Sequence, residues 1–350
     1  MRRPALVVTA AVLLALTIVL RAADDLVLDR FGAYLDTLRT QAAIPGLAAA
    51  IIGSNSVVRE FQFGWRNVDR SFRVEATTPF HVDGLTQIMT ASMVLLCAEQ
   101  GKISLNDRIG QFSTNTGEPD ATLAQILSHT SKQGEALVYS YRLERLNLLT
   151  APLAKCYDEP FRTAMAGLIL TPSLMMLDSV PGPDAATVGA AEGIDQAAID
   201  GYRRALDRLA TGYVVNGSTP TVAAYSAPTL TPSSGLITSV RDFANFDLGF
   251  KRGRLLLTDS IAAAWTPPVG ANGRRLPHGL GWFVQSYNGE TVVWQFGSGT
   301  ASSAMVITVP GRGLTLVLLA NSNGLAGFNL AAGDVSVSPF AKAFLGTFLR

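Results

Sequence analysis

Apolar residues recur at helical spacing in the segment from Phe80 to Lys102. Leu85, Ile88, Met89 and the small or apolar residues at 92, 93 and 96 follow the i, i+3, i+4, i+7 pattern of one buried helix face. Asp83 is a candidate N-cap for this helix, and Gly101 followed by Lys102 is a candidate stop. The pattern therefore predicts a core helix that begins close to residue 84.

Helices and strands alternate in blocks along the rest of the chain. A helical stripe of apolar residues over 25–43 precedes Pro45-Gly46 and two apolar runs typical of strands, 47–52 and 57–64. Residues 121–179 and 194–210 have mainly helical patterns. The C-terminal part predicts four strands separated by Gly- and Pro-bearing turns, and then a final helix: 282–287, 291–295, 301–309, 314–321 and 337–350.

The first 23 residues have the pattern of a targeting segment. Arg2 and Arg3 precede an apolar run from Ala5 to Leu20, and small residues follow at 22 and 23. Arg21 disfavours cleavage, and the run is short for a full membrane span, so a signal peptide and an N-terminal anchor both stay open. Either predicts an exported protein, periplasmic or extracellular, that contacts the membrane only through this segment.

Composition describes an ordinary globular protein with a large core, because 48% of its 350 residues are hydrophobic and 16% are charged. A net charge of +1 predicts no nucleic-acid partner. The three histidines are not at zinc-ligand spacing, so neither a metal nor another cofactor is expected. Cys97 and Cys156 could pair in an oxidising compartment. The position of Cys97 near the end of the core helix favours a small buried hydrophobic role instead.

Several short segments occur in an order that resembles one known superfamily. They are Phe80 to Gln87 at the start of the core helix, Thr122 to Ser131 with a His-Thr-Ser sequence, Tyr139-Ser140-Tyr141, Ser233 to Phe243, and Gln295-Phe296-Gly297 after Gly279-Leu280-Gly281-Trp282. Together they resemble the serine β-lactamase and penicillin-binding-protein superfamily, in its class C β-lactamase, esterase and D-alanyl-D-alanine peptidase branch.

The resemblance implies an α+β fold, in which an antiparallel sheet is flanked by N- and C-terminal helices and joined to a mainly helical domain. After the signal or anchor segment 1–23, residues 24–350 would form one β-lactamase-related domain. Residues 24–78 and 241–350 would be its α/β part, and 79–240 its mainly helical part.

The residues that carry the family's chemistry are replaced. The family's nucleophile and general base, in S-x-x-K, stand here as Gly84 and Gln87. Gly84 has no side chain to acylate, and Gln87 is neutral at every pH. In the family's Y-x-N motif Tyr139 fits but Tyr141 replaces Asn. In its third motif, K-T-G or H-x-G, Gln295 replaces the Lys or His. Without a neighbouring lysine we expect Tyr139 to stay protonated, with a pKa near its ordinary value of about 10.

The resemblance assigns a candidate catalytic role to Tyr139, and binding roles to Gly84, Gln87, Tyr141, Gln295, Gly297 and Ser298. In the family, the backbone N–H groups at the positions of Gly84 and Ser298 form an oxyanion hole. We interpret His129 as a structural histidine, because no orienting partner lies nearby in the sequence.

Three functions remain open from the sequence. The first is a catalytically degenerate protein that binds a ligand, such as a peptidoglycan-like or other carboxylate compound, or a partner, in the old cleft. The second is an active esterase, carboxypeptidase or β-lactamase with a non-standard nucleophile such as Ser131 or Ser298. The third is a structural or partner-binding envelope protein, whose cleft Tyr141 and Phe296 fill.

Overall fold

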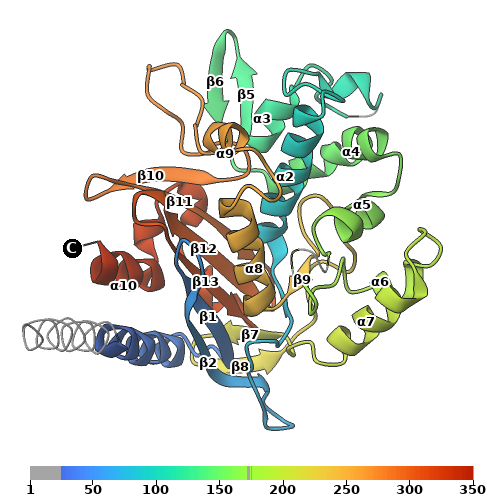
Figure 1. The fold of residues 1–350 in the computed structure, drawn as a ribbon. Helices are drawn as coiled ribbons and strands as arrows, with labels where there is room; N and C mark the ends of the chain where they lie inside the picture. The colour runs from blue at the N-terminus through green and yellow to red at the C-terminus, as the bar shows by residue number, and fades with distance from the viewer. Residues whose placement is uncertain (1–24, 115, 172–173, 175, 350) are drawn as a thin grey trace, which may run out of the picture.

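A seven-stranded antiparallel sheet forms the centre of the protein, in the order β10-β11-β12-β13-β1-β2-β3 (Figure 1). The structure is a computed structural model that describes residues 25–114, 116–171, 174 and 176–349. The predicted signal or anchor segment, 1–23, lies outside these residues. The strands of the sheet are β1 (Gly46–Ile52), β2 (Val57–Asn67), β3 (Phe72–Arg73), β10 (Phe283–Tyr287), β11 (Glu290–Ser298), β12 (Ser303–Val309) and β13 (Leu314–Ala320).

Alternation along the central strands divides the interior into two cores. In β1, Leu47, Ala49 and Ile51 face one core, whereas the residues between them face the other. All seven residues of β1 are buried. A strand that is buried on both faces requires this near-continuous apolar sequence, because successive side chains point to opposite sides of the sheet.

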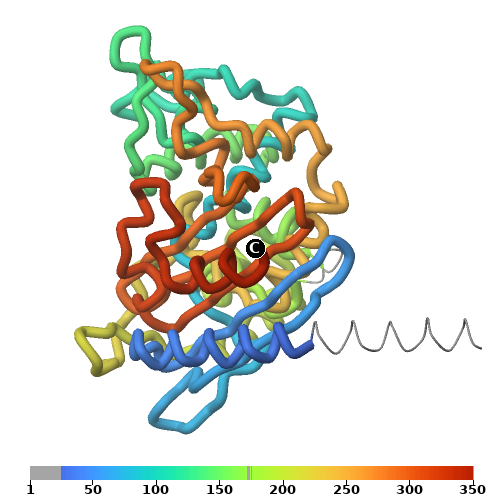
Figure 2. The backbone as a smooth tube through the Cα atoms, turned by 90° about the vertical axis from the view of Figure 1, so that its left-hand side faces the viewer, coloured from blue at the N-terminus to red at the C-terminus, as the bar shows by residue number. Residues whose placement is uncertain are grey.

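Two terminal helices cover one face of the sheet. The chain is helical from 25 to 41, and α10 (Pro339–Phe348) lies beside that helix (Figures 1 and 2). Phe31 packs against Phe344 and Phe348, with ring centroids 6.3 and 5.3 Å apart. The predicted flanking helices and the predicted α+β fold class are therefore confirmed.

The opposite face is covered by α8 (Val240–Lys251) and by a mainly helical part of the chain. The other helices are α2 (Thr86–Glu99), α3 (Leu123–Leu127), α4 (Thr150–Tyr157), α5 (Phe161–Leu168), α6 (Ala185–Val188), α7 (Gln196–Leu206) and α9 (Thr258–Ala264). Single 3-10 turns and segments are η1 (Asp83–Leu85), η2 (Ile109–Gln111), η3 (Leu143–Leu149), η5 (Pro310–Arg312), η6 (Asn323–Leu325), η7 (Leu330–Ala332) and η8 (Val335–Val337).

Three two-stranded ladders complete the described fold: β4 (Phe80–His81) with β9 (Ile237–Thr238), β5 (Thr130–Gln133) with β6 (Ala136–Tyr139), and β7 (Tyr213–Asn216) with β8 (Thr219–Val222). The hairpin β5–β6 corrects the prediction that 121–179 is helical. Val138 and Tyr139 are strand-formers, and Gly134 has the positive φ of +64° that a tight turn needs.

Of the two predicted caps of the core helix, the C-terminal one is confirmed and the N-terminal one is wrong. Gly101, with a φ of +68°, follows the helix end as predicted. Asp83 does not cap α2: it lies in η1, and its side chain bonds to Ser302 and Ser226 instead.

Cys97 of α2 and Cys156 of α4 form a disulfide, with Cα atoms 6.3 Å apart. Cys97 is fully buried, so the sequence predicted its burial correctly but favoured the wrong chemical state. The described residues contain no helix of the length and apolarity that a membrane span requires. The proposed subdomain boundaries stay a prediction.

Candidate functional site

Gly84 occupies the nucleophile position in η1, directly before α2. A Cβ atom on Gly84 would lie 2.9 Å from Leu143 Cδ2 and 3.4 Å from the Phe296 carbonyl oxygen. Gly84 is itself buried. A serine at this position would therefore require the side chain of Leu143, the first residue of η3, to shift.

Gln87 lies one turn further along α2, and its amide group is fully hydrogen-bonded. Its Nε2 donates to the Gly84 carbonyl oxygen at 2.9 Å and to the Tyr141 hydroxyl oxygen at 3.1 Å. Its Oε1 lies 3.1 Å from His129 Nε2. Gln87 has no solvent-exposed surface. It acts here as a neutral connector between α2, the 139–143 segment and His129.

His129 sits at a sharp turn between α3 and β5, with a φ of +50°. The Arg142 backbone N–H donates to its Nδ1 at 3.2 Å, so Nε2 carries the proton and donates to Gln87. Burial, and then the neighbouring His278 and Arg145, hold the pKa of His129 well below its ordinary value. This geometry agrees with the structural role that the sequence suggested, since both ring nitrogens have fixed partners.

His278 extends the chain of neutral contacts. Its ring lies edge-on to His129, with centroids 4.7 Å apart. Nδ1 donates to the Gly279 carbonyl oxygen at 2.8 Å, so Nε2 accepts from Gln295 Nε2 at 3.0 Å. Burial lowers the pKa of His278 to about 3. We call Gln87, His129, Tyr141, His278 and Gln295 the neutral network.

Gln295 takes the position of the family's lysine on β11 and is fully buried. Besides its bond to His278, its Nε2 donates to the Gly281 carbonyl oxygen at 3.1 Å. Its Oε1 accepts from the Phe296 N–H at 2.9 Å. Both of its N–H groups and its oxygen are thereby satisfied inside the protein, as a buried amide requires.

Tyr141 closes the former site with its ring. It packs on His129 at a centroid distance of 4.5 Å and stacks on Phe296 at 5.4 Å and Phe283 at 5.7 Å. Burial raises the pKa of its hydroxyl. An aromatic side chain in place of the family's Asn therefore turns a substrate-holding position into part of the hydrophobic core.

Tyr139, the candidate catalytic residue, lies at the end of β6 and points elsewhere. Its hydroxyl donates to the Ala331 carbonyl oxygen at 2.7 Å. Burial and then Tyr141 raise its pKa. The protonated state expected from the sequence is correct, but a pKa near the ordinary value is too low. The described contacts do not bring Tyr139 to Gly84 or Gln87.

Gly297 and Ser298 end β11 beside η1. A Cβ atom on Gly297 would lie 2.0 Å from the Val82 carbonyl oxygen, so only glycine permits this approach of strand and turn. Ser298 is exposed. The structure thus brings Gly84, Gln87, Tyr141, Gln295 and Gly297 into one region, with Ser298 at its edge and Tyr139 outside it.

A second polar cluster, which sequence reasoning missed, lies on the other side of η1. The fully buried Asp83 accepts hydrogen bonds from Ser302 and, at 3.1 Å, from Ser226. His81 Nδ1 lies 4.0 Å from Asp83 Oδ1, and its ring stacks on Tyr225. We call Asp83, His81, Ser226 and Ser302 the acidic cluster. His81, in β4, and Asp83, in η1, are two residues apart in the sequence, but no local signal pairs them with 226 and 302.

Burial dominates the ionisation of this acidic cluster. It raises the pKa of the Asp83 carboxyl, whereas His81 and the two serine hydroxyls oppose that rise. It lowers the pKa of His81, and Asp83 opposes that change. Neither ring nitrogen of His81 has a hydrogen-bond partner among the described residues.

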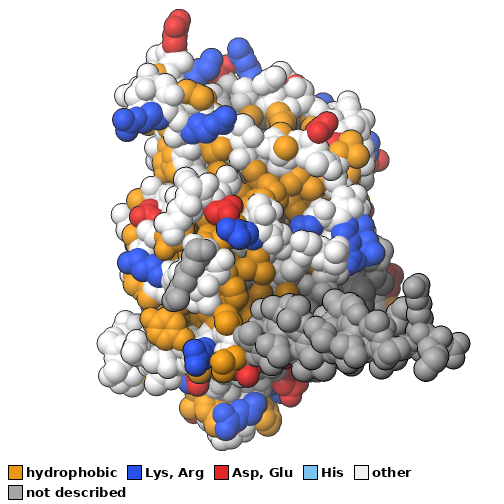
Figure 3. Space-filling model, turned by 60° about the vertical axis from the view of Figure 1, so that its left-hand side comes forward, with side chains coloured by type: hydrophobic (Ala, Val, Ile, Leu, Met, Phe, Trp, Pro, Cys, Tyr) orange, Lys and Arg blue, Asp and Glu red, His pale blue; other side chains and the backbone are white. Residues whose placement is uncertain are grey.

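The described residues offer no activated nucleophile in the former cleft. No hydrogen bond joins the hydroxyl of Ser131 or Ser298 to a His, Asp, Glu or Lys side chain in this part of the chain. No group of three or more potential metal ligands occurs among the described residues either. On the face in Figure 3, acidic and basic side chains are scattered among apolar ones and form no continuous stripe of one sign.

Comparison with known proteins establishes the family. The Beta-lactamase family model matches residues 31–335, and the chain therefore belongs to the β-lactamase family. Protein flp of Staphylococcus aureus is 26% identical over 94 residues, which are 25% of this chain and 19% of that protein. The match thus spans about a fifth of that relative's length.

Solved structures share the fold. A D-alanine carboxypeptidase AmpC from Burkholderia cenocepacia superposes with a TM-score of 0.69 at 19% identity, covering 93% of this chain and 100% of that one. The octameric penicillin-binding protein homologue from Pyrococcus abyssi gives 0.70 at 19% identity, with 85% and 74% covered. A class C β-lactamase from Rhodobacter sphaeroides gives 0.66 at 15% identity, with 91% and 98% covered.

Proposed function

We propose that this chain is an exported member of the β-lactamase family that forms no acyl-enzyme and acts by non-covalent binding. The observation that carries the proposal is the surroundings of residue 84, which has no side chain and where Leu143 Cδ2 comes within 2.9 Å of the position that a Cβ atom would take. Acyl transfer needs an activated nucleophile and a base within hydrogen-bond reach. Gly84 and Gln87 supply neither.

The neutral network supports the same proposal. Gln87 and Gln295 have all their amide hydrogens bonded to partners within the protein, and both histidine tautomers follow from their partners. Burial keeps both imidazoles uncharged near neutral pH. A ligand that entered here would have to displace these bonds as well as the stacked rings of Tyr141 and Phe296.

The filled site favours a binding or scaffold protein that presents its outer surface over one that holds a carboxylate compound in the old cleft. Export is supported by the targeting pattern of residues 1–23. It is also supported by the Cys97–Cys156 disulfide, since such bonds persist mainly in oxidising compartments.

Intact-mass spectrometry tests the proposal most directly. The purified protein is incubated with a fluorophosphonate and, separately, with a penicillin, alongside an active class C β-lactamase as the positive control. We expect no covalent adduct, with correct folding confirmed by circular dichroism. A stoichiometric adduct would overturn the proposal, and digestion would then identify the acylated Ser or Thr. Saturable penicillin binding without an adduct would instead restore the cleft as a ligand site.

A further inference from the structure

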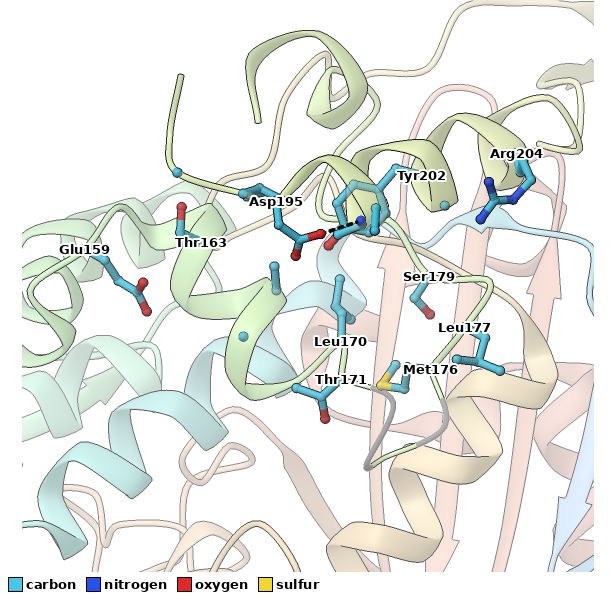
Figure 4. A pocket seen from close by; sticks show the side chains of 17 residues that line it. Glu159, Thr163, Leu170, Thr171, Met176, Leu177, Ser179, Asp195, Tyr202 and Arg204 are labelled. Carbon is cyan, nitrogen blue, oxygen red and sulfur yellow. Dashed lines mark hydrogen bonds between the residues drawn. The ribbon is translucent and has the colours of Figure 1, made fainter. Parts of the chain in front are cut away.

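A separate cavity of about 780 Å³ lies in the helical part of the protein (Figure 4). It is bounded by α5, by α7 and by residues 176–179, and it shares no lining residue with the neutral network or the acidic cluster. Its volume falls within the range of small-molecule sites, roughly 300–1,000 Å³. This cavity, unlike the former acyl site, is open.

The walls of the cavity are mainly apolar. Leu170, Met176 and Ile194 line it and are themselves largely buried, whereas Leu177 stands at the surface with 69% of its area exposed. Ala166 and Ala198 contribute small side chains from the two helices. An apolar chain entering the cavity would remove this surface, and its own, from water.

Two helix glycines keep the cavity open. Gly167 of α5 and Gly201 of α7 both line it. A Cβ atom on Gly167 would meet no atom within 4 Å, and one on Gly201 would meet only Arg204 Nη2, at 3.8 Å. Glycine inside a helix is less favourable than alanine, and neither position has a close neighbour that excludes a side chain. Gly167 is exposed and Gly201 is half-buried, so the space beside both helices is open to solvent and is not packed with side chains.

Two polar groups at the cavity lack partners. Tyr202 is 92% buried, since 8% of it is exposed, and its hydroxyl has no hydrogen bond among the described residues. Burial raises its pKa to about 12, so the hydroxyl is a donor at neutral pH. Arg204 is exposed at the rim of the cavity, with its Nη2 3.8 Å from the position of a Cβ atom on Gly201, and it forms no ion pair among the described residues. By contrast, the adjacent Arg203 pairs with Asp200 at 2.7 Å.

The acidic side chains at the cavity do not neutralise Arg204. The carboxylate of Asp195 accepts the Ala198 backbone N–H at 2.9 Å and so caps α7. Glu159 lies on the side of α5, whereas Arg204 lies toward the far end of α7 (Figure 4). The free cation therefore stands at one end of an apolar space.

We propose that this cavity binds an amphiphilic carboxylate, with its apolar chain between α5 and α7 and its anionic head at Arg204. The ring of Tyr202 forms part of the wall, and its hydroxyl is free to donate to the ligand. A guanidinium is well suited to a carboxylate because it offers two parallel N–H groups. The site is independent of the former acyl centre.

Isothermal titration calorimetry with dodecanoate below its micelle concentration tests this site in the full chain. Dodecanol serves as the neutral analogue and dodecyltrimethylammonium as the cationic one. We expect one saturable site that binds dodecanoate about tenfold more tightly than dodecanol, as a charged hydrogen bond implies. Binding of the cation as tight as that of dodecanoate would overturn the assigned charge, and no saturable binding of dodecanoate would overturn the site.

Single-residue variants test whether dodecanoate binds in this cavity. Gly201→Leu should fill the cavity and weaken dodecanoate binding at least tenfold, on the scale of the buried apolar contact that it removes. Gly167→Leu on the opposite wall repeats the test if the first variant unfolds. Arg204→Gln should bring dodecanoate binding down to the level of dodecanol, whereas Arg203→Gln, the matched control, should leave it unchanged. Undiminished binding in folded Gly201→Leu and Gly167→Leu would refute the location. None of these readouts depends on acylation, so the result is separate from the mass test above.

Discussion

Residues 83 and 84 are neighbours, yet they lie in buried environments of opposite character. Around Gly84, the neutral network contains no ionised group, and its two glutamine amides are completely hydrogen-bonded. Around Asp83, the acidic cluster holds a carboxyl group and an imidazole whose ring nitrogens make no hydrogen bond among the described residues, although Nδ1 lies 4.0 Å from the carboxyl group. A difference of one residue thus separates a region whose two histidines are held uncharged near neutral pH from one in which an acid lies beside a histidine.

The comparison shows how buried polar side chains avoid the cost of an unpaired charge. A lysine ammonium buried among neutral partners at residue 87 or 295 would be costly. Gln87 and Gln295 stand there instead, and their amides bond to histidines, to Tyr141 and to backbone carbonyls. The neutral network is therefore satisfied by hydrogen bonds within the protein.

Gln87→Lys should give the largest effect, because it returns a charge to the neutral network. The ammonium would be buried with no carboxylate among its present neighbours, so we expect a loss of about 3–5 kcal/mol in the free energy of unfolding. Urea denaturation followed by circular dichroism at pH 7 measures it. Gln100→Lys, on the exposed C-cap of the same helix, should stay within about 0.5 kcal/mol of the wild type. Equal stability of both variants would show that the network tolerates charge.

Acidification should weaken the neutral network through His278. Its pKa is about 3 in the folded protein and about 6.5 in the unfolded chain. The stability that the neutral His278 contributes to the folded protein is therefore fully present above pH 6.5 and is lost as the pH falls toward 3. Between pH 7 and pH 5 the loss should be roughly 2 kcal/mol.

Within the acidic cluster, Asp83 should respond in the opposite direction, whereas His81, whose pKa is lowered by burial, should respond as His278 does. The raised pKa of Asp83 means that folding is disfavoured while its carboxyl is ionised, and this penalty shrinks on acidification. Asp242, with a pKa raised to about 6 mainly by burial, acts in the same sense. The contribution of His278 is therefore isolated by comparing two proteins, wild type and His278→Gln. For each, the change in the free energy of unfolding between pH 7 and pH 5 is measured, and the two changes are subtracted. An identical pH dependence in both proteins would contradict it.

Removing the hydroxyl of Tyr141 or of Tyr139 should give the smallest changes in the free energy of unfolding. The two changes show which tyrosine is more tightly bonded within the protein. Tyr141→Phe takes an acceptor from the buried Gln87 amide and should cost about 1–3 kcal/mol, the usual penalty for an unpaired buried group. Tyr139→Phe only removes a bond to the partly exposed Ala331 carbonyl and should cost about 1 kcal/mol. The reverse order, measured by urea denaturation, would mean that Tyr139 is the residue integrated into the former site.

Much of the fold was readable from the sequence because it is carried by periodic burial. Spacing alone shows which residues are buried in the helical stripe at Leu28, Phe31 and Leu35 and in the apolar run at 47–52. The hairpin β5–β6 was missed because its four-residue strands are too short to show a period. Asp83 was misassigned because an N-cap signal is local, whereas its real partners lie about 140 and 220 residues away.

The candidate site could be predicted from the sequence only in part. The absence of a nucleophile at Gly84 and of a base at Gln87 follows from residue identity. The replacement of that chemistry by a hydrogen-bonded network does not, because it depends on His278 and Leu143, which no motif connects to Gly84. The choice between a paired and a free Cys97 likewise depended on tertiary distance.

The sheet order has a consequence for how the chain is made. Strand β1 is sandwiched between β2, its close successor, and β13, with Leu47 opposite Ala320. During vectorial synthesis, some 270 residues must emerge before β1 acquires its second neighbour. Until then its apolar edge is unprotected, which is the situation in which nascent chains aggregate or recruit chaperones. The central strand of the sheet is thus completed only when β13 has been made and can pair with it.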